Sequence, residues 1–279
     1  MKASIRKADI LIEALPYIQA FRNKVIVAKY GGSAIDDASA MRGILQDLVF
    51  LSSVGIRPVL VHGGGPMITR KLAAHGRKTH FIDGMRVTDR GTIRVVNEEL
   101  EKLNRRLVAQ VAALNGRADG IIPSRQVIVA SPHPQSAELG FVGLVQAVRA
   151  APLRRILMRH AIPVISPVGV GAGGQLYNIN ADEVASAVAV RLRAEKLVLL
   201  TNVRGILRRG ELISTVAAKR VPKLIGQEVI QSGMIPKVKA CVNALRRGVK
   251  KTHIIDASIP HAMLLEIFTK RGIGTEIIH

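Results

Sequence analysis

The chain has 279 residues, a formal net charge of +21 and 48% hydrophobic residues, so it can bury a substantial core, which argues against intrinsic disorder. Only 3% of the residues are aromatic and tryptophan is absent, which argues against a base-stacking surface for nucleic acid. The single cysteine, Cys241, excludes a disulfide framework and a cysteine metal site.

The amino-terminal segment and the basic residues bear on location and partners. Residues 1–7 are basic, but Asp9 and Glu13 interrupt the run that follows, so no signal peptide is predicted. No apolar stretch reaches the roughly 18 residues of a membrane span, and we expect a cytoplasmic protein without a membrane contact. The 41 Lys and Arg residues outnumber the 20 Asp and Glu residues. This excess suits an anionic partner, which could be nucleic acid, an acidic protein or a polyanionic small molecule such as ATP, or else a solvated basic surface.

Short β-branched runs alternate with helical patterns along the chain. Each run ends in a turn or a glycine corner, and we expect strands at 25–28, 59–61, 162–165, 196–200 and 252–255. Strands that are apolar on both faces and alternate with helices indicate a mostly parallel sheet covered on both sides, which is an α/β fold.

Helices and one hairpin fill the intervals between these strands. Helical spacing of leucines predicts a helix over 98–114, Asn180 suits the N-cap of a second helix, and Pro236 suits the first turn of a third. Between residues 126 and 145, alternating polarity and two prolines predict a hairpin, and the segment 168–174 is expected to be a glycine-rich loop. The chain divides into a first lobe up to about residue 175 and a second lobe beyond it.

Two glycine-rich corners, Gly31-Gly32 and Gly63-Gly64-Gly65, each follow a predicted strand. Backbone N–H groups at such corners can hold phosphate, because only glycine lets the chain wrap close to the phosphate oxygens. Neither corner matches a P-loop or a Rossmann fingerprint, so each alone fits a tight structural turn equally well. Lys29 at a strand end and Lys237 at a helix start stand out among the basic residues, because ligands of α/β proteins collect at such positions.

Five short motifs are distributed across essentially the whole chain. They are Lys29-Tyr30-Gly31-Gly32, His62-Gly63-Gly64-Gly65-Pro66, Gly84-Met85-Arg86-Val87-Thr88-Asp89, Tyr177-Asn178-Ile179-Asn180-Ala181-Asp182 and Gly233-Met234-Ile235-Pro236-Lys237. In order and approximate spacing this set resembles the N-acetylglutamate kinases of the amino acid kinase family. The joint match of five motifs is specific, whereas any single motif is not.

The resemblance implies a fold and a reaction. The fold is a three-layer αβα sandwich with a mostly parallel central sheet, of the amino acid kinase or carbamate kinase-like type. It implies a kinked N-terminal helix at 1–22, a substrate-binding lobe at 23–175 and an ATP-binding lobe at 176–279. The reaction is phosphorylation of the γ-carboxylate of N-acetyl-L-glutamate by ATP, in the second step of arginine biosynthesis. Mg²⁺ accompanies ATP and is held mainly by phosphates and water, so no metal-binding side chain is expected.

The resemblance also implies roles for individual residues. Lys29 and Lys237 would stabilise the transferring phosphoryl group, and Asp182 would orient both. Arg86, helped by Asn178, would bind the α-carboxylate of the substrate. Gly64 and Gly65 would contact substrate and phosphate through their backbone N–H groups, and Gly31 and Gly32 would make similar contacts. The candidates for binding ATP are Thr201, Asn202 and Gly205. His62 is interpreted as a packed strand-end residue, because the reaction needs no proton transfer.

Residues 8–18, within the N-terminal helix implied at 1–22, are similar to the mobile helix that interlaces dimers in arginine-inhibited hexameric members of the family. Leu11, Leu15 and Ile18 give this helix an apolar face, and Pro16 predicts its kink. The likeness implies a homo-oligomer, either a dimer or a hexamer, and inhibition by L-arginine. The alternative is a helix that only caps the fold. The candidates for the arginine site are His253, Glu266 and residues 272–275.

Two departures from the family keep other functions open. Asn202 and Arg204 replace the usual Asp and Pro near the nucleotide, and the family is typically acidic. A kinase for aminoadipate or glutamate on an acidic carrier protein would suit the basic charge. A catalytically weak protein that binds RNA or a regulatory partner is a second alternative. Arg86 favours a free small substrate, and the joint presence of the two lysines and Asp182 favours an enzyme.

Overall fold

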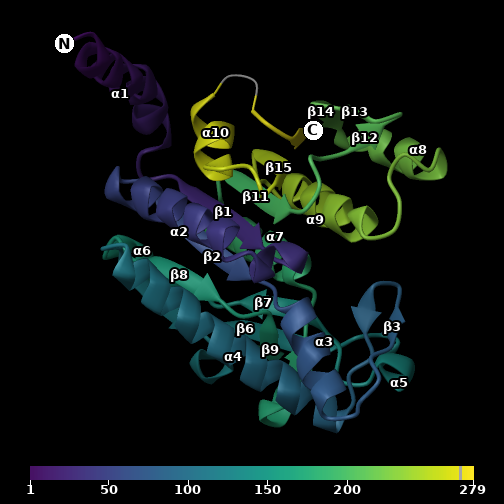
Figure 1. The fold of residues 1–279 in the computed structure, drawn as a ribbon. Coiled ribbons are helices and arrows are strands. Elements are labelled where there is room, and N and C mark those ends of the chain that lie inside the picture. Colours follow the sequence, from purple (N-terminus) through teal and green to yellow (C-terminus); the bar gives the residue numbers. More distant parts are fainter. Residues whose placement is uncertain (270–271) are drawn as a thin grey trace.

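An eight-stranded sheet forms the centre of the molecule (Figure 1). The computed structural model describes residues 1–269 and 272–279, apart from the side chains of Ala3, Ser4, Lys7 and Ser33. Neighbouring strands are parallel except for β15 and β16, which are antiparallel. The strand order is β14 (Thr215–Ala217), β16 (Thr275–Ile278), β15 (Lys251–Asp256), β11 (Lys196–Thr201), β1 (Val25–Tyr30), β2 (Arg57–His62), β8 (Ile162–Ile165) and β5 (Ala118–Ile121). All five predicted strands are present, and the mostly parallel sheet is confirmed.

Helices cover both faces of this sheet, so the predicted three-layer αβα sandwich is also confirmed (Figure 1). One face carries α2 (Ala38–Ser53), α4 (Arg90–Ala113) and α10 (Ala262–Phe268). The other carries α6 (Ala150–Met158), α7 (Ala181–Leu192) and α9 (Met234–Arg246). Successive strand side chains point to opposite faces, so Ile26 and Ala28 pack into one apolar cluster and Val27 into the other.

A second sheet and several smaller elements accompany the central sheet. A second sheet has the order β10 (Leu176–Asn178), β9 (Val168–Val170), β6 (Ile128–Pro132) and β7 (Gly143–Val148). The predicted hairpin is present as β6–β7. The segment 168–174 was expected to be a loop, but part of it forms the strand β9, because its backbone pairs with β10 and β6. The other elements are α3 (Gly65–Ala74), α5 (Ser136–Leu139), α8 (Val221–Gly226), the hairpin β3 (Phe81–Ile82)–β4 (Met85–Arg86) and the hairpin β12 (Leu207–Arg208)–β13 (Glu211–Leu212).

The N-terminal helix α1 (Lys2–Phe21) extends away from the sheet (Figure 1). Near its end, the Tyr17 ring meets the Phe268 ring of α10 edge to face, with 6.2 Å between centroids. Pro16 lies inside the helix, and its kink stays a prediction, as do the lobe boundaries. Within residues 1–269 and 272–279, no helix combines the length and the apolar character that crossing a membrane requires.

Candidate functional site

A pocket of about 290 Å³ lies at the carboxyl ends of β1 and β2. Three helices begin at its wall: α3 after Gly64, α7 after Asn180 and α9 after Gly233. The first N–H groups of a helix have no partner within it, and the helix dipole adds partial positive charge there. The pocket therefore suits a ligand that carries phosphate.

Two lysines share one buried carboxylate in this pocket. Nζ of Lys29, on β1, lies 2.9 Å from Oδ1 of Asp182, and Nζ of Lys237, on α9, lies 2.9 Å from Oδ2 of the same residue. Asp182 is in the first turn of α7, where the helix dipole favours a carboxylate. Three elements far apart in sequence thus bring together the three residues predicted to be catalytic.

Burial and charge act against each other in this cluster. Burial raises the pKa of the Asp182 carboxyl, but the ammonium groups of Lys29 and Lys237 outweigh it and hold the pKa below its usual range. Burial also lowers the pKa of Lys29, and the Asp182 carboxylate opposes that shift only in part. Two ammonium groups share a single carboxylate, so the cluster presents net positive charge to the pocket.

The two glycine corners meet beside Lys29. A Cβ atom on Gly31 would lie 2.9 Å from Nζ of Lys29 and 3.3 Å from Cα of Gly63, so any side chain there would displace the lysine. Gly32 has a φ of 75°, in the left-handed region that favours glycine. Among the candidate glycines, Gly32, Gly64 and Gly65 line the pocket, and Gly31 adjoins it through Lys29.

Arg86 supplies a second cationic position. Its Nη2 donates to the Gly65 carbonyl at 3.0 Å and to Oγ1 of Thr69 at 2.9 Å, and its Nη1 donates to Oγ1 of Thr79 at 3.2 Å. The side chain is buried, and no ion pair among the described residues includes it. Burying a guanidinium without an anion is costly, so a carboxylate ligand would supply the missing partner.

Sequence reasoning missed the residues that hold Arg86. Besides Thr69 and Thr79, the Phe81 ring lies under the guanidinium, with its centroid 4.9 Å from Cζ. Phe81 belongs to the β3–β4 hairpin, whose strands of two residues are too short to show periodicity. Its turn, Asp83-Gly84, has positive φ at both positions, and an Asp-Gly pair is a hairpin signal that was available in the sequence.

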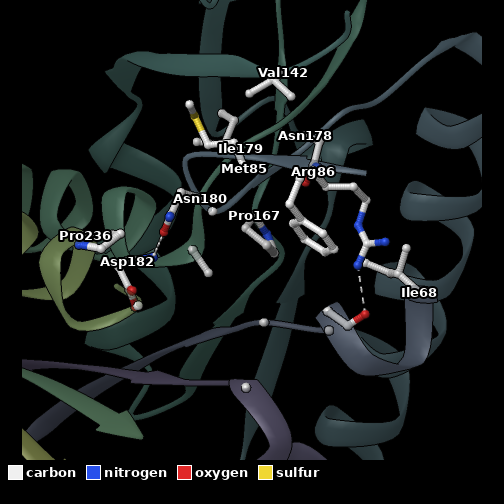
Figure 2. Close-up of a pocket in the computed structure, with 18 of the residues that line it drawn as sticks. Ile68, Met85, Arg86, Val142, Pro167, Asn178, Ile179, Asn180, Asp182 and Pro236 are labelled. Carbon is white, nitrogen blue, oxygen red and sulfur yellow. Dashed lines mark hydrogen bonds between the residues drawn. The ribbon is translucent and has the colours of Figure 1, made fainter. Parts of the chain in front are cut away.

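The two cationic positions lie on opposite sides of the pocket. Figure 2 shows Asp182 and Pro236 on one side and Arg86 and Ile68 on the other. Asn178 lies on the side of Arg86 and donates from Nδ2 to Oγ1 of Thr88 at 3.2 Å. Apolar lining from Val142, Pro167 and Ile179 completes the pocket, so it fits a small molecule with two anionic ends. The lining residues also include Leu100, Met85 and Phe81.

The three residues predicted to bind ATP, Thr201, Asn202 and Gly205, lie outside this pocket. Thr201 ends β11, and its Oγ1 lies 3.3 Å from Oδ1 of Asn202. Gly205 has a φ of 141°, and a Cβ atom on it would lie 2.6 Å from Oγ1 of Thr275. Close packing against β16 therefore explains this glycine, and a role in nucleotide binding stays a prediction for all three residues.

The side chains at the pocket offer a metal ion little. Among the described residues, no group of three or more His, Cys, Asp or Glu side chains could hold one. Of the described residues that line the pocket, Asp182 is the one with a carboxylate, and both of its oxygens face lysine ammonium groups. A resident metal does not fit this donor set, so a divalent ion would enter bound to its nucleotide.

Known proteins resemble this chain over its whole length. The model of the amino acid kinase family matches residues 24–256. Acetylglutamate kinase from Desulforamulus reducens is 46% identical over 285 residues, which covers 100% of this chain and 99% of that protein. Acetylglutamate kinase from Moorella thermoacetica is 45% identical and covers 98% of both chains.

Solved structures resemble it as well. N-acetylglutamate synthase from Neisseria gonorrhoeae, complexed with coenzyme A and N-acetyl-glutamate, matches with a TM-score of 0.87 and 30% identity over 96% of this chain. The chain spans 62% of the length of that synthase. The same synthase complexed with coenzyme A and L-arginine matches with a TM-score of 0.83 and 29% identity over 95% of this chain and 64% of that one. Carbamate kinase from Giardia lamblia, at 16% identity and a TM-score of 0.66, shares the predicted fold.

Proposed function

The chain belongs to the amino acid kinase family, and we propose that it transfers the γ-phosphoryl group of ATP to the γ-carboxylate of free N-acetyl-L-glutamate. The products are N-acetyl-L-glutamyl 5-phosphate and ADP, in the second step of arginine biosynthesis. One observation carries the proposal: the Lys29–Asp182–Lys237 cluster lies across a small pocket from Arg86, whose buried charge has no anion among the described residues.

The geometry suits attack by a carboxylate. The substrate γ-carboxylate is already an anion, so it needs no general base, and catalysis depends on alignment and on positive charge near the transferring group. Lys29 and Lys237 supply that charge, and Asp182 keeps both ammonium groups at the same end of the pocket. Arg86 at the far side binds the α-carboxylate, which leaves the γ-carboxylate at the lysines.

Gly64 and Gly65, at the N-terminus of α3, would direct backbone N–H groups toward the phosphoryl oxygens, in the manner of an oxyanion hole. Gly31 and Gly32 would act similarly from the other corner. ATP would lie over the carboxyl end of β11, near Thr201, Asn202 and Gly205, and bring Mg²⁺ with it. The metal would be held by phosphate oxygens and water, and it would reduce the negative charge that the nucleotide brings into the pocket.

The alternatives with a carrier-bound acceptor or without catalysis are not favoured. Relatives that match essentially the whole chain are acetylglutamate kinases. The pocket is also small, and Arg86 would bind a carboxylate that a carrier linkage consumes. ADP release with free N-acetyl-L-glutamate, compared with L-glutamate and N-acetyl-L-aspartate, tests this choice, since only the first has both the acetyl group and the matching length.

Arg86→Ala should raise the KM for N-acetyl-L-glutamate by about 10- to 100-fold, because hydrogen bonds to a charged group contribute about 1.5–3 kcal/mol. The KM for ATP should change little. The matched control is Arg106→Ala, which removes an exposed arginine of α4 that does not line the pocket. Steady-state kinetics on folded variants check this, and an unchanged KM for acetylglutamate in Arg86→Ala would remove the assigned role.

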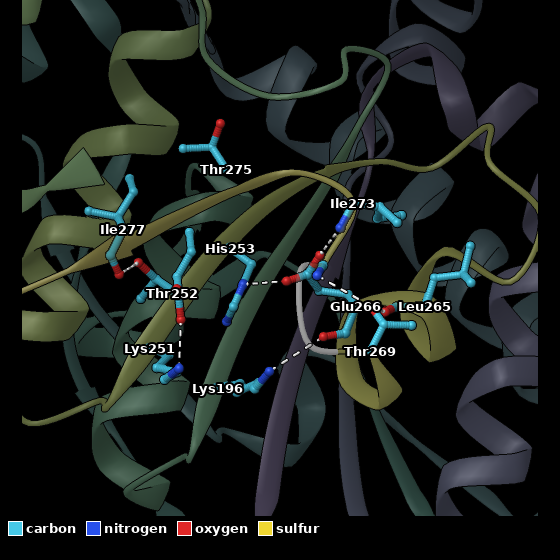
Figure 3. A network of polar contacts seen from close by, with 12 residues as sticks. Lys196, Lys251, Thr252, His253, Leu265, Glu266, Thr269, Ile273, Thr275 and Ile277 are labelled. Carbon is cyan, nitrogen blue, oxygen red and sulfur yellow. Dashed lines mark hydrogen bonds and ion pairs between the residues drawn. The ribbon is translucent and has the colours of Figure 1, made fainter. Parts of the chain in front are cut away.

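We propose L-arginine as an inhibitor that binds between α10 and the end of α1. There Oε1 of Glu266 lies 2.6 Å from Nδ1 of His253, and Oε2 accepts the Ile273 N–H at 2.8 Å (Figure 3). Nζ of Lys196 lies 5.1 Å from the Phe21 ring centroid, at the end of α1. A Cβ atom on Gly272 would lie 2.7 Å from Oε1 of Glu266, so glycine lets the backbone approach this carboxylate closely. A carboxylate is the group that pairs with a guanidinium. The likeness to a synthase solved with L-arginine supports this proposal.

L-Arginine should inhibit the wild-type protein and raise its melting temperature, whereas L-citrulline, which lacks the positive charge, should do neither. Glu266→Gln should lose both effects of arginine and keep its turnover without arginine, because it retains the shape of the side chain without its charge. Inhibition that persists unchanged in Glu266→Gln would place arginine elsewhere.

We also propose that α1 packs against a second copy of the chain, in a dimer or hexamer, and that the enzyme acts in the cytoplasm. The exposed apolar residues Ile10, Leu11, Ile12 and Leu15 on α1 support self-association. Light scattering on the wild type and on Leu11→Lys compares the masses, and an equal mass for both would argue against a contact through this face.

A further inference from the structure

A buried polar chain lies directly behind the glycine corner of the pocket. His62, the last residue of β2, and Asn104, in the middle of α4, are 0% and 1% exposed. Nδ2 of Asn104 donates to the Val164 carbonyl of β8 at 2.8 Å and lies 3.1 Å from Nε2 of His62. Nδ1 of His62 lies 2.9 Å from the Gly63 carbonyl oxygen. The reaction proposed above uses neither side chain.

The partners of these groups determine where the proton of His62 lies. The Val164 carbonyl can only accept, so the Asn104 amide must turn its NH₂ group toward it. The same NH₂ group faces Nε2 of His62, which must then be the bare, accepting nitrogen. The proton therefore sits on Nδ1 and is donated to the Gly63 carbonyl. Burial lowers the pKa of His62 to about 4, so the ring stays neutral near pH 7.

The anchored carbonyl belongs to the peptide that carries the Gly64 N–H. In a trans peptide the carbonyl and the N–H point in opposite directions, so a carbonyl held by the buried imidazole directs the Gly64 N–H away from it. Gly63, Gly64 and Gly65 line the pocket on that side, and no hydrogen bond among the described residues uses the Gly64 N–H. The corner at Gly63 also packs against Gly31, since a Cβ atom on Gly63 would lie 3.2 Å from the Cα atom of Gly31.

We propose that His62, oriented by Asn104, is a positioning residue that sets the Gly63–Gly64 peptide so that the Gly64 N–H faces the transferring phosphoryl group. The proposal rests on the kinase function proposed above. A rotated peptide would present the Gly63 carbonyl instead, and its partial negative charge would oppose the phosphoryl oxygens. His62 therefore acts on the rate through the backbone, without exchanging a proton with the substrate.

Two amide substitutions separate the contacts of the ring. In His62→Asn the amide nitrogen takes the place of Nδ1 and can still donate to the Gly63 carbonyl. In His62→Gln the amide reaches the place of Nε2, so Asn104 keeps a partner but the Gly63 carbonyl loses its donor. We expect His62→Gln to lower kcat by about 10²-fold, as for a lost oxyanion donor, and His62→Asn to stay within about tenfold of the wild type. KM values for both substrates should change little in either variant, and melting temperatures check the folding of both.

A readout on the free protein tests the anchor without any substrate. Long-range ¹⁵N–¹H spectra of histidine-labelled protein, with the His62 signal identified by its loss in His62→Asn, should show a neutral ring protonated on Nδ1 from pH 6 to 8. A proton on Nε2, or equal loss of kcat in both variants, would overturn the proposal. A wild-type protein that carries the proton on Nδ1 but shows no turnover would contradict the kinase function, while the hydrogen bond from His62 to the Gly63 carbonyl would still be supported.

Discussion

Replacing Lys237 or Lys29 by methionine should lower kcat by about 10²- to 10³-fold, the range for removing one preorganised group that stabilises charge in the transition state. Methionine keeps most of the side-chain length and removes the charge. Because the charge of the phosphoryl group grows during transfer, the KM values for both substrates should change much less than kcat. Steady-state kinetics with ATP and N-acetyl-L-glutamate measure the separation between the two effects.

Lys102→Met is the matched control for this prediction. It removes an ammonium group whose ion pair with Glu99 is on the surface of α4, and it should leave kcat unchanged. Equal activity in Lys237→Met and Lys102→Met would mean that Lys237 does not act on the transferring group. A higher KM with an unchanged kcat in Lys237→Met would assign Lys237 to substrate binding alone.

The same lysine cluster predicts an alkaline limb in the pH dependence of kcat. Lys29 acts only when protonated, and burial holds its pKa below the ordinary 10.5, with the Asp182 carboxylate opposing the shift. Activity is therefore present below the folded pKa and is lost as the pH rises through it, earlier than for an exposed lysine. In Lys29→Arg the guanidinium stays charged, so the residual activity should extend to higher pH. An identical limb in wild type and Lys29→Arg would assign the limb to another group.

Asp182→Asn should lower the free energy of unfolding by about 3–5 kcal/mol, the cost of removing one partner from a buried ion pair. Lys29 would remain buried without a counter-charge, and Lys237 would lose its partner as well. We expect kcat to fall too, because the two ammonium groups would repel each other and leave the positions that Asp182 sets. Urea unfolding at pH 7 and steady-state kinetics measure the two effects.

The pH dependence and a double variant test this cause. The folded pKa of Asp182 is depressed, so its stabilisation is present above the unfolded pKa and is lost as the pH falls through the folded pKa. The difference in free energy of unfolding between wild type and Asp182→Asn should therefore become smaller at acid pH. Lys29→Met combined with Asp182→Asn should be more stable than Asp182→Asn alone, since the uncompensated charge is gone. If the double variant loses as much free energy of unfolding as the two single variants lose together, the result would contradict the ion-pair account.

Much of the fold and site followed from local sequence. The strand runs are continuous and apolar because the sheet is covered on both faces, so they were recognisable without tertiary information. Asn180 caps α7 as predicted, with its side chain accepting the Asp182 N–H, because capping depends on neighbouring residues. Lys29, Asp182 and Lys237 were selected together because five motifs matched jointly, and the structure places their charged groups in contact.

What the sequence did not predict depends on contacts between distant segments. His62 and Asn104 are 42 residues apart and meet only because α4 packs on the sheet. The strand β9 forms in a glycine-rich segment because β10 and β6 supply hydrogen-bond partners on both sides. Gly205 packs against Thr275 of β16, 70 residues further along the chain, and this contact could not be read from its local motif. Local propensity contains none of this information.

The transfer of a phosphoryl group to the γ-carboxylate can be measured most directly by trapping the acyl phosphate with hydroxylamine. Wild-type protein with ATP, Mg²⁺ and N-acetyl-L-glutamate should form the 5-hydroxamate of acetylglutamate in an amount equal to the ADP released, and mass spectrometry locates the modified carboxyl group. ADP release without hydroxamate, or a folded protein that releases no ADP with this substrate, would contradict the account.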